Sequence, residues 1–172
     1  MSRVWHGGGV RVALPGEFER LHEIEEASDG LFAEVGIGPF PDEDEESHFE
    51  EAEVVLVSGD PPVGFACVGI VDASAHLWQL SVHPSEARRG RGSALVTAVC
   101  EWADSEGYPG VTLTTFRDVA FNAPFYARLG FRALDDLTPG LAAIRDREAR
   151  TGHDELGPRI AMRKDLRSPF GS

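Results

Sequence analysis

The chain has 172 residues, of which 42% are hydrophobic and 26% charged, as is ordinary for one globular domain with a sizeable core. Its 16 basic and 29 acidic side chains give a net charge of −13, so it should repel nucleic acid and anionic membranes and attract cationic ligands. The sequence contains no run of 18 apolar residues, no apolar signal-peptide core and no metal-ligand spacing of His and Cys. We therefore expect a cytoplasmic protein with no metal, no nucleic-acid partner and no membrane contact.

The first elements are predicted from apolar spacing and from the positions of Gly and Pro. Val10–Leu14 is a β-rich run that ends at a Pro-Gly pair, and apolar residues at helical spacing predict a helix over Glu17–Ser28. Gly and Pro then interrupt the pattern repeatedly from Ser28 to Glu53. This stretch holds five consecutive acidic residues, Asp42–Glu46, which favour a solvated face or a first helical turn. A flexible acidic lid over a site for a cationic amine is the alternative.

The middle of the chain is predicted to contain four strands and one long helix. Val54–Ser58 and Val63–Val71 read as an antiparallel pair joined by a Gly-Asp-Pro-Pro turn. His76–Val82 is the next strand, and apolar residues at i, i+1, i+4, i+5, i+8 and i+9 then predict a helix over Ser93–Glu106. Val111–Phe116 is the fifth strand. This order mixes hairpins with one crossover, which indicates a single α+β domain with a mixed sheet.

The last part of the chain adds two helices and a strand. Asn122–Phe131 predicts a short helix with Asn at its N-cap and Gly at its end. Thr138–Gly152 begins with a Thr-Pro pair suited to a helix start, and Arg159–Leu166 alternates charged and apolar residues as a strand does. We therefore expect one domain over residues 1–172, with a core at about 10–135, an inserted helix at about 138–152 and a closing strand at about 159–166.

A basic, glycine-spaced turn lies between the His76–Val82 strand and the long helix, and reads Arg88-Arg89-Gly90-Arg91-Gly92. The first N–H groups of a helix have no internal partner and lie at the positive end of its dipole. Glycines let a phosphate approach the backbone, and arginines add forked donors. The patterns G-x-x-x-x-G-K-[ST] and G-x-G-x-x-G are both absent. The turn therefore predicts a phosphate-binding cradle of another kind, with a solvated basic loop as the alternative.

Two motifs together resemble the GNAT superfamily of N-acetyltransferases. The turn is similar to the family's acetyl-CoA signature, Gln/Arg-x-x-Gly-x-Gly/Ala, and departs from it at Ala87. Downstream, NAPFYARLGF resembles the family's second motif, with Asn122, Tyr126 and Gly130-Phe131 on matching positions. The resemblance covers about residues 54–131.

The resemblance implies a fold and an activity. The fold is a single GNAT-like α+β domain, whose mixed, mostly antiparallel six- to seven-stranded sheet is flanked by helices, here with an extra helix before the last strand. The activity is acetyl-CoA-dependent transfer of an acetyl group to a primary amine of a small molecule or peptide, by direct attack in a ternary complex. The residues implied in cofactor binding are Leu80, Ser81, Val82, Arg88, Arg89, Gly90, Arg91, Gly92, Ser93, Asn122 and Tyr126.

The resemblance also implies catalytic roles. Tyr126 lies near the thiol as the general acid, and backbone N–H groups near Val82 polarise the thioester carbonyl. His76 falls where serotonin-type N-acetyltransferases carry a catalytic His, so it is the first candidate for the general base. A packed aromatic ring and a strand-end histidine in water or core are the structural alternatives for Tyr126 and His76. Weaker candidates for the base are His83, His22, Glu25 and Glu26.

Other interpretations remain open at this stage. Cys67 and Cys100 are typical of buried thiols in a reducing compartment, and nothing indicates a covalent acyl-enzyme. A non-catalytic CoA-binding sensor or regulatory domain would keep the cradle without turnover. An acidic protein-interaction module would instead use Asp42–Glu51. The inserted helix could cover the acceptor site or form a contact in a homodimer.

Overall fold

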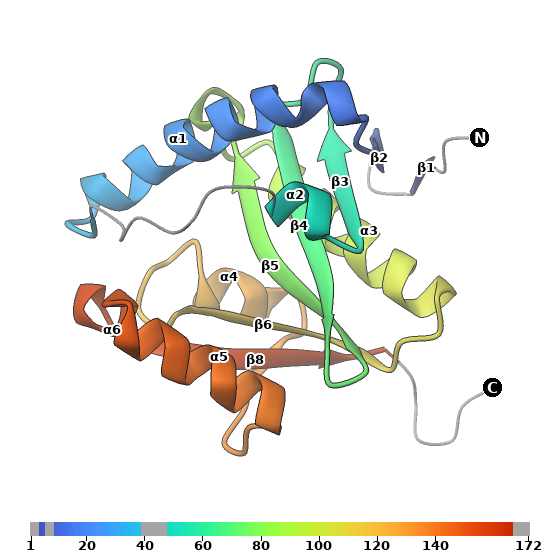
Figure 1. The fold of residues 1–172 in the computed structure, drawn as a ribbon. Helices are drawn as coiled ribbons and strands as arrows, with labels where there is room; N and C mark the ends of the chain where they lie inside the picture. Colours follow the sequence, from blue (N-terminus) through green and yellow to red (C-terminus); the bar gives the residue numbers. More distant parts are fainter. Residues whose placement is uncertain (1–3, 6–8, 39–47, 167–172) are drawn as a thin grey trace.

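The computed structural model describes residues 4–5, 9–38 and 48–166 (Figure 1). The acidic block Asp42–Glu46 lies outside these ranges. The described strands form one eight-stranded sheet in the order β1-β2-β3-β4-β5-β6-β8-β7, in which only β5 and β6 pair in parallel. The strands are β1 (Val4–Trp5), β2 (Val10–Val12), β3 (Val54–Ser58), β4 (Gly64–Val71), β5 (Ser74–Val82), β6 (Gly110–Phe116), β7 (Arg132–Ala133) and β8 (Arg159–Asp165).

Helices cover both faces of this sheet (Figure 1). The helices are α1 (Phe18–Glu34), α2 (His48–Glu51), α3 (Arg91–Ser105), α4 (Ala123–Arg128), α5 (Pro139–Arg150) and α6 (His153–Leu156), with 3₁₀ turns η1 (Pro15–Glu17) and η2 (Pro84–Glu86). Side chains alternate along β4, so Ala66 and Val68 enter the core under α3 while Phe65 and Cys67 enter a second core under α1. The mixed, mostly antiparallel sheet and the extra helix before the last strand confirm the predicted fold class. The two-residue strands β1 and β7 raise the strand number above the predicted six to seven.

The first helix is longer than the sequence predicted. It continues from Ser28 through Gly30 to Glu34. Leu21, Ile24 and Ser28 are buried on one face, and Phe32 continues that face half-buried. Gly30 is exposed, where a helical glycine costs only about 1 kcal/mol relative to alanine. The prediction that the helix pattern breaks after Ser28 was therefore wrong, because packing of the apolar face outweighs the glycine.

The extra helix α5 is fixed at its start by the β4–β5 turn. Thr138 occupies the predicted N-cap position, but its side chain makes no capping hydrogen bond to the helix. Instead, Asp72 accepts a hydrogen bond from the Gly140 N–H at 2.7 Å. Hydrogen bonds from the Thr138 side chain and from the backbone of α5 lower the pKa of Asp72, so a charged carboxylate from another element caps the helix.

Glu148 holds α5 against the sheet. Its carboxylate accepts hydrogen bonds from Thr114 Oγ1 at 2.9 Å, Arg159 Nε at 2.8 Å and Arg145 Nη1 at 2.9 Å. Its side chain is 12% exposed, so water screens these contacts weakly. The Arg159 guanidinium also lies 4.5 Å from the centroid of the Phe116 ring. One carboxylate therefore joins α5 to β6 and β8.

Glu148→Gln should lower the free energy of unfolding by about 2–3 kcal/mol, because Arg145 and Arg159 would lose the carboxylate that balances their partly buried charges. Urea denaturation measures this change. The matched control is Asp146→Asn on the exposed side of the same helix, which should change the free energy by less than about 0.5 kcal/mol. Equal effects of the two variants would contradict the assigned role of Glu148.

Candidate active site

The sheet opens between β5 and β6. These strands pair only at Ala75↔Val111 and His76↔Thr112. Beyond that point β5 stays paired with β4 up to Val82, whereas β6 stays paired with β8 up to Phe116. Figure 1 shows the two strands diverging. One edge of β5 thus faces an opening in the middle of the sheet.

The backbone groups of Leu80 and Val82 face this opening. The His83 N–H donates to the Val63 carbonyl at 2.8 Å, so His83 points toward the β4 side. Backbone groups alternate along a strand, which directs Ser81 toward Phe65 in β4 and the two flanking residues away from β4. The backbone groups of Leu80 and Val82 are therefore directed into the opening, and their role in cofactor binding stays a prediction. Ser81, predicted with them, is buried and uses its backbone inside the sheet.

A β-bulge begins the divergence, and no local sequence pattern predicts it. Cys67 and Val68 face Gln79 and Leu77, which leaves Trp78 as an extra residue in β5. The indole is 49% exposed and lies over Gly69, where a Cβ would clash with its nitrogen. A bulge bends its strand and increases the local twist. The bulge thus turns β5 away from β6 directly after the last paired residue.

The glycine turn leads from β5 into the start of α3. Arg88 and Gly90 have φ angles of +64° and +78°, and Gly90 is the N-cap. The helix begins at Arg91, two residues before the predicted start, so the N–H groups of Arg91, Gly92 and Ser93 belong to its first turn. A Cβ on Gly90 would meet nothing within 4 Å, so the space at the helix start is open. This geometry fits an anionic ligand.

The arginine side chains of the turn take different directions. Arg91 donates to Ser58 Oγ in β3 at 3.0 Å and to Glu86 at 3.4 Å. Arg89 lies 3.6 Å from the same Glu86 carboxylate, and Arg88 is exposed. The Arg91 guanidinium is therefore already bonded within the protein. Only the backbone N–H of Arg91 is left for the predicted contact with phosphate.

Helix α4 lies beside the cradle. A Cβ placed on Gly92 would be 3.4 Å from Phe125 Cζ and 4.0 Å from Leu80 Cδ2. Tyr126, the next residue of α4, is 8% exposed, and its ring packs edge-on against Phe131. Burial raises the pKa of Tyr126, so its hydroxyl stays protonated at neutral pH. The structure thus brings the turn, the open edge of β5 and the Tyr126 motif together.

Asn122 stands at the N-cap of α4, as predicted, but its side chain is used elsewhere. Its Oδ1 accepts from the Thr115 hydroxyl at 2.8 Å and from the Phe116 N–H at 3.3 Å. The amide therefore fixes the end of β6 to the start of α4.

His76 lies on the other face of β5, in the protein interior. It is 1% exposed, and its Nδ1 is 2.7 Å from Thr112 Oγ1. Desolvation lowers the pKa of His76 to about 4, so the ring is neutral at pH 7. Of the weaker candidates, His83 binds Ser85 within its own turn, and His22 is exposed on α1 beside Phe49.

Two further sets of residues bear on the chemistry. Cys67 and Cys100 are both buried; burial raises the pKa of Cys67 to about 12 and also raises that of Cys100, which opposes thiolate formation. Within the described ranges, no group of three or more His, Cys, Asp or Glu side chains could hold a metal ion, and no helix is long and apolar enough to cross a membrane.

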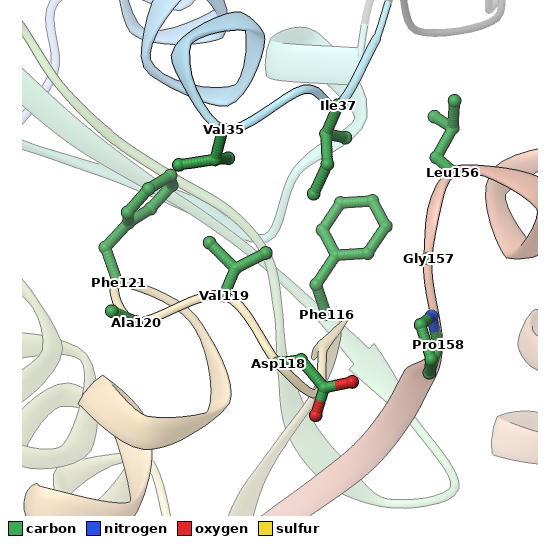
Figure 2. Close-up of a pocket in the computed structure, with 10 residues that line it drawn as sticks. All are labelled: Val35, Ile37, Phe116, Asp118, Val119, Ala120, Phe121, Leu156, Gly157 and Pro158. Atoms are coloured by element: carbon green, nitrogen blue, oxygen red, sulfur yellow. The ribbon is translucent and has the colours of Figure 1, made fainter.

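A pocket of about 460 Å³ lies at the end of β6 (Figure 2). Three described segments that are distant in sequence line it, and no local sequence pattern predicts it. Figure 2 shows the Phe116 ring at the centre of the lining, with Val119 and Phe121 on one side and Leu156 on the other. Its lining residues are Val35, Ile37, Phe116, Asp118, Val119, Ala120, Phe121, Leu156, Gly157 and Pro158.

Comparison with known proteins identifies the family. Residues 18–131, more than half of the chain, match the model of the Acetyltransferase (GNAT) family. The chain therefore belongs to the GNAT family and is an acetyltransferase of that family, as its motifs predicted.

Solved structures share the fold at low identity. The PaiA N-acetyltransferase from Thermoplasma acidophilum, in complex with coenzyme A, is 17% identical with a TM-score of 0.65, over 91% of this chain and 97% of that one. The ribosomal-protein-S18-alanine N-acetyltransferase from Escherichia coli is 17% identical with a TM-score of 0.64, over 96% and 94%. N-acetylglutamate synthase from Neisseria gonorrhoeae, complexed with coenzyme A and N-acetyl-glutamate, is 16% identical with a TM-score of 0.65, over 93% of this chain and 35% of that one.

The buried His76 should make stability depend on pH. Its folded pKa of about 4 lies below the ordinary value of 6.5, so between these pH values the unfolded chain binds a proton that the folded chain does not. Wild type should therefore lose up to about 1.4 kcal/mol per pH unit more than His76→Gln as the pH falls from 6.5 to 4. Urea denaturation across this range measures both slopes. The control His22→Gln, which removes an exposed histidine, should keep the wild-type slope; a wild-type slope in His76→Gln would contradict the assignment.

Proposed function

We propose that this acetyltransferase moves an acetyl group from acetyl-CoA to a primary amine by direct attack in a ternary complex. One observation carries the proposal: the start of α3, the open edge of β5 and the Tyr126 motif meet at Gly92, Leu80 and Phe125. Acetyl-CoA supplies an acetyl group already activated as a thioester. The E. coli neighbour is described as an alanine N-acetyltransferase and the N. gonorrhoeae neighbour holds N-acetyl-glutamate, which supports an amine acceptor without specifying it.

The residues present fit the cofactor. The first-turn N–H groups of Arg91, Gly92 and Ser93 would hold its pyrophosphate, and the open space at Gly90 admits it. Arg88 and Arg89 add positive charge in an otherwise acidic protein, and the Asn122 amide N–H₂ group is a further donor. The N–H and C=O groups of Leu80 and Val82 would pair with the pantetheine arm as a strand edge does. An N–H in this part of β5 would also polarise the thioester carbonyl.

Two side chains are proposed to move protons. Tyr126 would protonate the departing thiolate, and its hydroxyl is kept protonated by burial. His76 would accept the proton of the attacking amine. With the Thr112 hydroxyl donating to the Ala75 carbonyl at 3.4 Å, Nδ1–H of His76 would donate to Thr112 Oγ1 and Nε2 would be the basic atom. Because the pKa of His76 is about 4, the proton would have to pass on to water.

The location of the protein is part of the same proposal. Its acidic composition and its two buried thiols support a cytoplasmic enzyme. Pairing into a homodimer stays a prediction.

Gly92→Glu should abolish acetyl-CoA binding, because a carboxylate at the start of α3 would repel the pyrophosphate. The variant should fold, since a Cβ at Gly92 makes only ordinary contacts and an acidic residue suits a first helical turn. Isothermal titration calorimetry with acetyl-CoA measures the effect. The control Gly30→Glu places the same change on exposed α1, where a Cβ meets nothing within 4 Å, and should bind as wild type does. No binding by wild type would overturn the proposed function.

Tyr126→Phe should lower kcat by about 10²-fold, the usual contribution of a general acid. Acetyl-CoA affinity should stay within about twofold, because the ring packing against Phe125 and Phe131 is kept. Release of free CoA thiol measures turnover, and calorimetry measures affinity. The control Tyr108→Phe removes the hydroxyl of a tyrosine beside Trp102 and should leave kcat unchanged. Turnover by Tyr126→Phe at the wild-type rate would remove Tyr126 as the acid, and binding without any turnover in wild type would favour a CoA-binding sensor.

A further inference from the structure

The pocket at the end of β6 indicates which amine the enzyme accepts. We propose that the acceptor is a small primary amine with an aryl or branched alkyl group, and that this apolar group occupies the pocket. The proposal rests on the proposed acetyl transfer. It names a substrate class that the family and the fold leave open.

The pocket exposes apolar side chains in a concave site. Val35 is 55% exposed and Phe121 38% exposed, although both line the pocket beside the nearly buried Phe116. Apolar groups exposed together in a concavity are typical of ligand sites, because a ligand that covers them removes apolar surface from water. The volume of about 460 Å³ lies within the range of small-molecule sites.

The pocket continues the proposed active site along β6. Side chains alternate along this strand, so Thr112, Thr114 and Phe116 lie on one face. Thr112 contacts His76, Thr114 contacts Glu148 of α5, and Phe116 lines the pocket. Phe116 lies four residues after Thr112, which corresponds to about 13 Å along the strand. An acceptor whose apolar group lies beside Phe116 can therefore bring its amine to His76, at the closed end of the opening, only if several bonds separate the two groups.

The floor of the pocket is held in place before any ligand arrives. The Phe116 ring has the Arg159 guanidinium 4.5 Å from its centroid and the Phe32 ring centroid at 5.7 Å. Its N–H is bonded to Asn122 Oδ1 at 3.3 Å. Because the Phe116 ring is already ordered, binding a ligand costs little further conformational entropy. An aromatic ring can also stack on Phe116, which a flexible polar chain cannot do.

The charges around the pocket favour an amine whose charged end lies outside it. Among the lining residues within the described part of the chain, Asp118 is the only charged one, and Arg117 Nε lies 3.0 Å from one of its oxygens. The hydrogen bond from Arg117 lowers the pKa of Asp118, so the two form a neutralised ion pair. The described lining residues therefore offer no unpaired charge to a second ammonium group of a diamine. The net charge of −13 still attracts cationic amines to the protein.

The test compares amines with saturating acetyl-CoA, using release of CoA thiol as the readout. The probes are phenylalkylamines from benzylamine to 4-phenylbutylamine, the polar amines ethanolamine and 1,4-diaminobutane, and a short peptide with a free N-terminal phenylalanine. We expect kcat/KM for the best phenylalkylamine to exceed that of either polar amine at least tenfold, and we expect the longer members of the series to be better than benzylamine.

Two matched variants test whether the preference for phenylalkylamines depends on the pocket. Val35→Glu places a carboxylate at the pocket and should raise KM for the best phenylalkylamine about tenfold or more, while Val12→Glu, the same change at a 40% exposed valine of β2, should leave it unchanged. Calorimetry with acetyl-CoA on each variant reports that the donor site is intact. Equal effects of the two variants, equal use of polar amines, or a strong preference for the peptide would overturn the proposal. Failure of wild type to bind acetyl-CoA would overturn the proposed function itself, and direct titration of 4-phenylbutylamine into wild type and Val35→Glu would then test the pocket alone.

Discussion

The site depends on the point at which β5 and β6 stop pairing. The last paired residues, His76 and Thr112, are also joined through their side chains, so this end of the opening is closed by two kinds of contact. Directly beyond it the bulge at Trp78 bends β5 away. Backbone groups in a protein interior need partners. The edge at Leu80 and Val82 is therefore where the proposed pantetheine arm would supply hydrogen-bond partners that β6 does not supply.

The strand β6 carries different chemistry on its two faces. Leu113 and Thr115 point toward α3 and α4, and Thr115 there fixes Asn122. Thr112 and Thr114 point to the other face, where His76 and Glu148 are bonded to them. The motifs proposed to bind the donor thus lie on one face, and the proposed base and pocket lie on the other. A donor and an acceptor that approach from opposite faces would meet in the opening, which suits direct attack without a covalent intermediate on the enzyme.

Local sequence patterns predicted the position of an element where the residues of that element carry the signal themselves. Val54–Ser58 was predicted to the residue, and the glycine turn and the Tyr126 motif lie where their spacing indicated. Local patterns did not predict side-chain hydrogen bonds whose partner lies on a distant element. Asn122 and Thr138 occupy the predicted N-cap positions, yet the side chain of one bonds β6 and that of the other bonds Asp72. The pocket has no local signal at all, because its three lining segments meet only after the chain has folded.

The arrangement of charges around the glycine turn bears on the departure from the family signature at Ala87. Glu86 is close to both Arg89 and Arg91, and Arg91 is also bonded to Ser58 in β3. The single carboxylate of Glu86 therefore offsets part of the positive charge that the three arginines bring to the turn. The donors with fixed directions are the N–H groups of the first turn of α3, which are oriented by helix geometry and by the left-handed backbone at Gly90. A site built from backbone groups depends on which residues are glycine, and only weakly on the side chain that precedes them.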